Sequence, residues 1–172
     1  MWLKNRKGLR HRLPSKVQAW VYETGSLTQR LRADYGASVK VKILYHRWAR
    51  PSLDECKLLA VPTHHYALTR EVLLHADGKP LLLARTIIPE ATLKGAHRNL
   101  SHLGTRPLGE VIFAYPKLGR LALEATLLPT VCWSPAALEL ADIQQSIWGR
   151  RTVYAIAGCS MLVSEFFLPE IL

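Results

Sequence analysis

Polar and apolar residues alternate along several stretches of this chain, which is the pattern of β-strands that bury one face. In residues 39–45 the apolar side chains fall on every second position, and lysines lie between them. Residues 65–75 and 80–88 are also rich in apolar residues, and the dipeptide Asp77-Gly78 between them is a strong signal for a two-residue hairpin turn. The pattern therefore predicts three strands, the last two of which form a hairpin.

The rest of the chain predicts further strands and several helices. Residues 120–128 favour a strand, and residues 148–157 and 160–168 favour a second hairpin around Gly158. The sum of about six strands, at least four of them in hairpins, favours an α+β fold with a single antiparallel sheet and helices covering one face. Apolar spacing and proline positions predict helices at 15–31 with a break at Gly25-Ser26, at 90–103 before Gly104, and at 107–113 from Pro107. Residues 135–142 favour a short helix or a loop, and residues 50–63 favour a connection with room for one helical turn.

Length and composition fit one folded domain. The chain has 172 residues, of which 49% are hydrophobic and 21% are charged. A chain of this size and hydrophobicity can bury a core, so we expect residues 1–172 to form a single domain. No stretch approaches the roughly 18 consecutive apolar residues of a membrane-spanning helix, so stable membrane insertion is not expected.

Residues 1–13 are interpreted as a basic N-terminal arm. They contain five cations (Lys4, Arg6, Lys7, Arg10 and Arg12) and no acidic residue. The segment has no apolar core of the kind that a secretory signal requires. The net charge of +10 indicates an anionic partner, which can be a small acid, a nucleic acid or a membrane surface. The three widely spaced cysteines fit a reducing compartment, so a cytoplasmic protein is expected.

Three charged residues fall on the apolar faces of predicted strands. Arg70 and Arg85 each have an apolar residue two positions away on both sides, and Glu165 has the same setting in the last strand. A buried charge costs several kcal/mol unless it is paired or hydrogen-bonded. The three side chains can therefore line one interior cavity, provided that no β-bulge reverses the faces.

An arginine and a glutamate in one dry cavity suit a particular kind of ligand. The guanidinium fork fits a carboxylate with two parallel hydrogen bonds, and a glutamate among apolar residues can act as a general acid or base. The ligand would be a small anion that has a carboxylate and a group to protonate or deprotonate. Two structural alternatives stay open, namely a salt bridge between Arg70 and Glu165 within the core, and an Arg85 that reaches solvent.

Five short motifs follow one another in a specific order. They are Arg70–Pro80 (REVLLHADGKP), Ala84–Pro89 (ARTIIP), Pro107–Gly109 (PLG), Trp148–Arg151 (WGRR) and Ser164–Pro169 (SEFFLP). In sequence and in order they resemble the chorismate pyruvate-lyase family of bacterial ubiquinone biosynthesis. The likeness runs from about Trp20 to the C-terminus and leaves the basic arm outside.

This resemblance implies a fold and a reaction. The fold would enclose an internal ligand cavity under helical flaps, here the segments around Leu27 and at residues 92–113. The reaction would split chorismate into 4-hydroxybenzoate and pyruvate, the first step of ubiquinone ring synthesis, with no cofactor. Enclosure of the ring implies slow release of the product and hence product inhibition.

The resemblance also implies roles for individual residues. Arg70 and the backbone amides of Leu108 and Leu27 would hold the ring carboxylate; Leu27 stands where the family often has Met. Glu165 would face the ring hydroxyl and move a proton during the elimination. Arg85 would meet the enolpyruvyl carboxylate. Glu165, Arg70 and Arg85 are thus the expected catalytic residues, and they would act mainly by orientation and charge placement.

No metal site is expected from the histidines. His64 and His65 are adjacent, so on a strand they would point to opposite faces, and His97 and His102 are not at the spacing of metal ligands on a helix. The expected partners are chorismate and 4-hydroxybenzoate, with no nucleic acid, and the protein is expected to be a monomer. Arg150 is interpreted as part of a solvated strand face.

Two other classes of function compete with the enzyme. A domain of the same fold that senses a small carboxylate without converting it is the main alternative, although such domains follow a DNA-binding domain, for which there is no room before Trp20. Nucleic-acid binding through the basic arm is the second. It lacks support from an RRM-type aromatic signature or a helix-turn-helix. The enzyme is therefore the favoured function.

Overall fold

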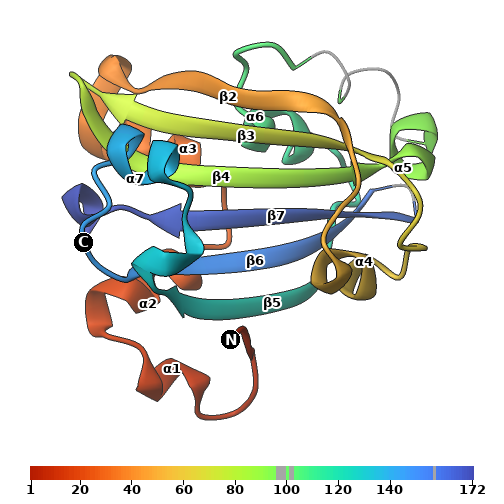
Figure 1. The fold of residues 1–172 in the computed structure, drawn as a ribbon, viewed down its shortest axis with the longest axis horizontal. Coiled ribbons are helices and arrows are strands. Elements are labelled where there is room, and N and C mark those ends of the chain that lie inside the picture. The colour runs from red at the N-terminus through yellow and green to blue at the C-terminus, as the bar shows by residue number, and fades with distance from the viewer. Residues whose placement is uncertain (96–99, 101–102, 157) are drawn as a thin grey trace.

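One antiparallel sheet of seven strands forms the centre of the molecule (Figure 1) in the computed structural model, which describes residues 1–95, 100, 103–156 and 158–172. The strand order is β1-β5-β6-β7-β4-β3-β2, and each neighbouring pair is antiparallel. The α+β class and the single sheet agree with the prediction, and the unpredicted strand is the two-residue β1. The strands are β1 (Leu3–Lys4), β2 (Lys40–Ala49), β3 (Ala67–Ala76), β4 (Lys79–Pro89), β5 (Gly119–Leu128), β6 (Ile147–Ile156) and β7 (Cys159–Phe167).

The central hairpin of β3 and β4 turns where the sequence predicts it. Asp77 and Gly78 have positive φ angles of 49° and 82°, as a type I′ turn requires. The register then shifts between Leu74 and His75, because β4 carries one extra residue. This β-bulge reverses which side chains of β4 share a face with those of β3.

Helices begin close to the predicted positions. The helix predicted at 15–31 with a break at Gly25-Ser26 forms two helices, and the Ser26 Oγ caps the second one by accepting a hydrogen bond from the Gln29 N–H. The predicted helix at 90–103 is described as far as Gly95, and residues 96–99, 101 and 102 lie outside the described residues. The helices are α1 (Leu9–Arg12), α2 (Ser15–Val21), α3 (Leu27–Tyr35), α4 (Leu53–Leu59), α5 (Glu90–Gly95), α6 (Leu108–Ile112) and α7 (Pro135–Leu140), with 3₁₀ turns at η1 (Gly36–Ser38), η3 (Thr130–Cys132) and η4 (Pro169–Ile171).

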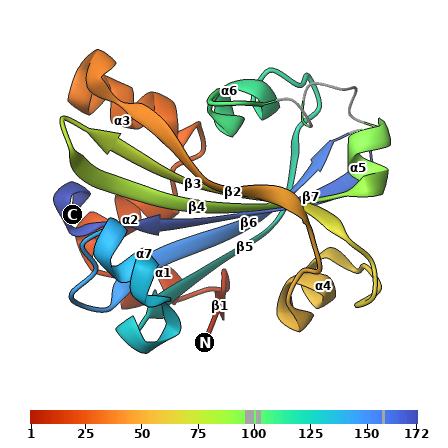
Figure 2. The ribbon, with the colours of Figure 1, turned by 45° about the horizontal axis from the view of Figure 1, so that its top comes forward.

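Both faces of the sheet are covered by helices. Figure 2 shows α3 and α6 on one side of the sheet and α4 and α7 on the other. Helices α2, α3 and α6 pack on the face that carries Leu82 and Val163, whereas α4 and α7 pack on the face that carries Leu162 and Phe166. The sequence pattern predicts helices on one face only. The second face is also covered because the central strands β4 and β7 bury apolar side chains in both directions.

The basic N-terminal residues are anchored to the edge of the sheet. Leu3 and Lys4 pair with β5, and Leu9 and Leu13 are buried in the core. The cations of this segment remain exposed. Residues 1–13, interpreted from the sequence as an arm, therefore have an ordered path along the domain.

Candidate active site

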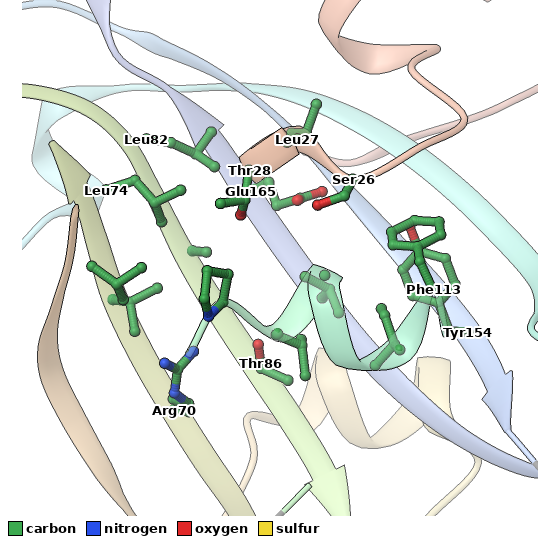
Figure 3. Close-up of a pocket in the computed structure, with 18 residues that line it drawn as sticks. Ser26, Leu27, Thr28, Arg70, Leu74, Leu82, Thr86, Phe113, Tyr154 and Glu165 are labelled. Carbon is green, nitrogen blue, oxygen red and sulfur yellow. The ribbon is translucent and has the colours of Figure 1, made fainter. Parts of the chain in front are cut away.

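A cavity lies between the sheet and the first turns of α3 and α6 (Figure 3). Including its opening to solvent, it has a volume of about 520 Å³. Strands β2, β3, β4, β6 and β7 form its floor. Both predicted flap regions contribute to its cover, one through Leu27 and the other through Leu108. The lining is mostly apolar and consists of Ser26, Leu27, Thr28, Val41, Arg70, Val72, Leu74, Leu82, Ala84, Thr86, Pro107, Leu108, Gly109, Ile112, Phe113, Tyr154, Val163 and Glu165.

Arg70 lines this cavity from β3 and is only 2% exposed. Its Nη2 donates hydrogen bonds to the carbonyl oxygens of Gly104 and Arg106 at 3.0 and 3.2 Å. Its Nε has no hydrogen-bond partner and no carboxylate pairs with it within the part of the chain that is described. Burial lowers the pKa of Arg70 from its ordinary value, because the charged form loses hydration. A buried cation with an unused donor is an arrangement that an anionic ligand would complete.

Glu165 lines the same cavity from β7. Its Oε2 accepts a hydrogen bond from the Nε of Arg150 at 2.7 Å, so the alternative of a salt bridge between Arg70 and Glu165 is wrong. Arg150 is 1% exposed, which also overturns its interpretation as a residue of a solvated face. A signal for this pair was present in the sequence, since counting back from the hairpin turn at Gly158 places Arg150 opposite Glu165.

Leu27 and Leu108 each occupy the first position of a helix at the cavity. Leu27 begins α3 after the Ser26 cap, and Leu108 begins α6 after Pro107. At this position a backbone N–H has no acceptor within its own helix and is free to bind another group. Leu27 and Leu108, whose backbone amides are expected to hold a ring carboxylate, therefore both line the cavity and both carry an N–H group without a partner in its own helix.

Arg85 lies on the opposite face of the sheet, outside the cavity. Its Nε donates to the Glu55 Oε1 at 2.7 Å, and it forms a second ion pair with Glu71. The expectation that Arg85 meets the enolpyruvyl carboxylate in the cavity is therefore wrong. The bulge in β4 is the cause: without the extra residue Arg85 would pair with Arg70, whereas in the observed register Arg70 pairs with Thr86 and Arg85 with Glu71.

The rest of the cavity wall suits a flat, largely apolar ligand. Phe113 and Tyr154 meet edge to face, with ring centroids 6.0 Å apart and an interplanar angle of 79°. Aliphatic side chains such as Leu74 and Leu82 line the far wall (Figure 3). The arrangement provides a cation, a carboxylate and apolar walls in one enclosed space.

The described residues contain no group of three or more His, Cys, Asp or Glu side chains placed to hold a metal ion. In the same residues, no helix has the length and apolar character needed to cross a bilayer.

The sequence matches a model of the chorismate lyase family over residues 1–172, including the basic N-terminal segment that the motifs left outside. A probable chorismate pyruvate-lyase from Methylococcus capsulatus is 45% identical over 156 residues, which cover 91% of this chain and 96% of that protein. A second probable chorismate pyruvate-lyase, from Aromatoleum aromaticum, is 38% identical over 99% of this chain and 93% of that protein.

Solved structures with a similar fold include the C-terminal domain of PhnF and a GntR-family transcriptional regulator. The C-terminal domain of PhnF aligns with a TM-score of 0.62 at 12% identity, over 85% of this chain and 89% of that one. A GntR-family regulator from Bacillus cereus aligns with a TM-score of 0.61 at 16% identity, over 79% of this chain and 95% of that one. At these identities the likeness shows a common fold.

Proposed function

Because this chain belongs to the chorismate lyase family, we propose that it is an enzyme that splits chorismate into 4-hydroxybenzoate and pyruvate. The observation that carries the proposal is that Arg70 and Glu165 line one cavity under α3 and α6. β4 separates β3 from β7, so the two backbones are at least about 10 Å apart across the sheet. A ligand bound in the cavity would therefore meet Arg70 on one side and Glu165 on the other.

Arg70 is the proposed anchor of the ring carboxylate. Its buried guanidinium has an unused Nε donor, and the backbone amides of Leu108 and Leu27 would supply further hydrogen bonds. Held at this end, the ring would present its hydroxyl and its ether to Glu165. The protein would act mainly by fixing the ligand in this orientation and by placing charge beside it.

Glu165 is the proposed proton-transfer residue. In the reaction the ether C–O bond breaks, the ring loses a proton and becomes aromatic, and the released enolpyruvyl group gains a proton to become pyruvate. Glu165 would carry a proton between these positions as a general base and acid. Formation of the aromatic ring drives the elimination, so this proposal includes no metal or organic cofactor.

The enclosed site supports a further expectation about product release. Leu27 and Leu108 belong to the cover of the cavity, so a bound 4-hydroxybenzoate would leave only after α3 or α6 moves. We therefore propose slow release and inhibition by 4-hydroxybenzoate. We also place the reaction in the cytoplasm, at the start of ubiquinone ring synthesis; the three free cysteines fit a reducing compartment.

The direct test is to incubate the pure protein, treated with a chelator, with chorismate and to measure 4-hydroxybenzoate and pyruvate in equal amounts. Replacing Arg70 with Ala should weaken chorismate binding and turnover together, because it removes the buried cation. An Arg70→Ala variant of normal activity would show that the anchor is elsewhere. If neither product forms with the wild-type protein, the chain would instead be a carboxylate-sensing domain.

A further inference from the structure

Arg150 is a buried cation whose contacts point in two directions. From β6, its Nε donates to the Glu165 Oε2 at 2.7 Å. Its Nη1 donates to three carbonyl oxygens of one backbone segment, at 3.1 Å to Trp20, 3.3 Å to Val21 and 2.7 Å to Glu23. Because only 1% of the residue is exposed, these two sets of acceptors, and not solvent, stabilise the charge.

The backbone segment that Arg150 holds leads into the cover of the cavity. Trp20 and Val21 are the last residues of α2, and the chain then runs through Glu23 to Ser26, the cap of α3. Leu27, the next residue, lines the cavity. One side chain therefore connects the carboxylate at the cavity with the stem of the helix that covers it.

We propose that Arg150 is a positioning residue, which holds the Glu165 carboxylate toward the hydroxyl end of the ligand and fixes the approach to α3. This inference rests on the proposed role of Glu165. A guanidinium is suited to the task because its separate nitrogens reach the carboxylate and the carbonyls at the same time. An ammonium group has one nitrogen and cannot occupy both places.

The test is an Arg150→Lys variant, which keeps the positive charge but not the fork. Its affinities for 4-hydroxybenzoate and for benzoate, which lacks the hydroxyl, are measured by calorimetry. The wild-type protein should prefer 4-hydroxybenzoate, because its hydroxyl meets Glu165. In the variant this preference should fall by about tenfold, the loss expected for a misplaced charged hydrogen-bond partner. Benzoate affinity should stay nearly unchanged, because Arg70 still holds the carboxylate.

Steady-state kinetics provide a second readout. Arg150→Lys should lower kcat by more than it raises KM, since the misplaced group acts on the reacting end of the ligand. Arg151→Lys is the matched control. Arg151 follows on the same strand, is 5% exposed and is also ion-paired, to Glu124 and Asp54, but it lies on the other face of the sheet. It should keep the full preference for 4-hydroxybenzoate.

Three results would overturn the proposal. An Arg150→Lys protein with the wild-type preference would show that the fork does not position Glu165. An equal loss of both affinities would show that Arg150 only supports the fold. If the wild-type protein and a Glu165→Gln variant both bind the two ligands equally well, the hydroxyl does not meet Glu165, and the proposed role of that residue fails as well.

Discussion

Arg70 and Arg85 lie on neighbouring strands, but their side chains lie on opposite faces of the sheet and have different surroundings. Arg70 is enclosed at the cavity with an unused donor, whereas the guanidinium of Arg85 is taken up by Glu55 and Glu71. A buried cation without a carboxylate lowers stability unless it serves a ligand. The first arginine is therefore suited to binding and the second to holding the fold.

Replacing Arg85 with Met should separate these two roles. We expect kcat and KM to stay within about twofold of wild type, while the free energy of unfolding falls by about 1–3 kcal/mol because Glu55 loses its partner in a buried setting. Arg70→Met is the matched variant and should do the reverse, with activity lost and stability little changed. Urea denaturation and initial rates measure both. A strong loss of activity in Arg85→Met would show that Arg85 takes part in the reaction.

The sequence predicts the cavity residues only as far as alternation holds. Arg70 and Glu165 stand out because each interrupts an apolar face, and the structure brings both to one cavity. Arg85 stands out in the same way, but a single extra residue in β4 turns it to the other side. The pattern does not reveal the burial of Arg150, because a strand residue beside other polar residues is interpreted as solvated and because its burial depends on α2, which is distant in sequence.

At the scale of elements, α3 and α6 approach each other closely above the cavity. A Cβ at Gly109 would lie 2.3 Å from the Ser26 Oγ and 3.1 Å from the Ser26 Cβ. Glycine is therefore needed here for the contact between two helix starts, and its φ angle is not the reason. This contact determines how closely the first turns of α3 and α6 approach each other above the cavity.

A Gly109→Ala substitution should push the two helix starts apart. Overpacking of this kind costs about 1–3 kcal/mol, so we expect a lower Tm and weaker binding of 4-hydroxybenzoate by about tenfold. Combining it with Ser26→Gly removes both clashing atoms, and glycine is a tolerable helix cap, so the double variant should recover most of the affinity. Calorimetry on the two single variants and the double variant decides this. Additive losses would exclude the contact as the cause.

An ion pair between Arg32 of α3 and Glu110 of α6 joins the same two helices. The side chains are 43% and 30% exposed, and pairs of this kind contribute about 1 kcal/mol or less. Glu110→Gln should therefore leave stability nearly unchanged but speed the release of 4-hydroxybenzoate by up to about fivefold, and the difference from wild type should shrink in high salt. Stopped-flow displacement measures the rate. Glu170→Gln, which breaks the distant pair with Lys79, should not alter it.

At the scale of the whole molecule, the two faces of the sheet have different tasks. The face under α3 and α6 holds the cavity. On the other face, the acids of α4 bind arginines of the sheet, Asp54 with Arg151 and Glu55 with Arg85, and Glu124 adds a second partner to Arg151. These pairs tie α4 to β4 and β6, on the side of the sheet where no ligand is expected.

The class of the fold could be predicted because hairpins are local. The turn at Asp77-Gly78 and the turn at Gly158 each fix two neighbouring strands from a few residues. The pairing of β1 with β5 joins residues far apart in the chain, and a two-residue strand has no period that a sequence pattern can reveal. For a related reason the pattern predicts helices on one face only, since α4 and α7 pack on side chains of strands that are distant in the chain, and local alternation does not assign a helix to a face.

Acid stability tests the division of tasks between the two faces. Burial alone would raise the pKa of Glu55, but hydrogen bonds and the charge of Arg85, together with hydrogen bonds from Ser52, outweigh it and hold the pKa below its ordinary value of 4.5. The unfolded chain therefore takes up this proton at a higher pH than the folded protein does. The contribution of Glu55 to stability is complete above pH 4.5 and is lost as the pH falls through the folded value.

Glu55→Gln should consequently lower the free energy of unfolding by about 1–3 kcal/mol at pH 7, and the gap to wild type should narrow below pH 4.5. Urea denaturation from pH 7 downward measures it. Glu90→Gln, whose carboxylate pairs with Lys94 on the surface, should change stability little at any pH. A gap that stays constant into acid would mean that the carboxylate charge of Glu55 is not what holds α4. Because Glu55 lies across the sheet from the cavity, its loss should leave KM for chorismate unchanged at pH 7.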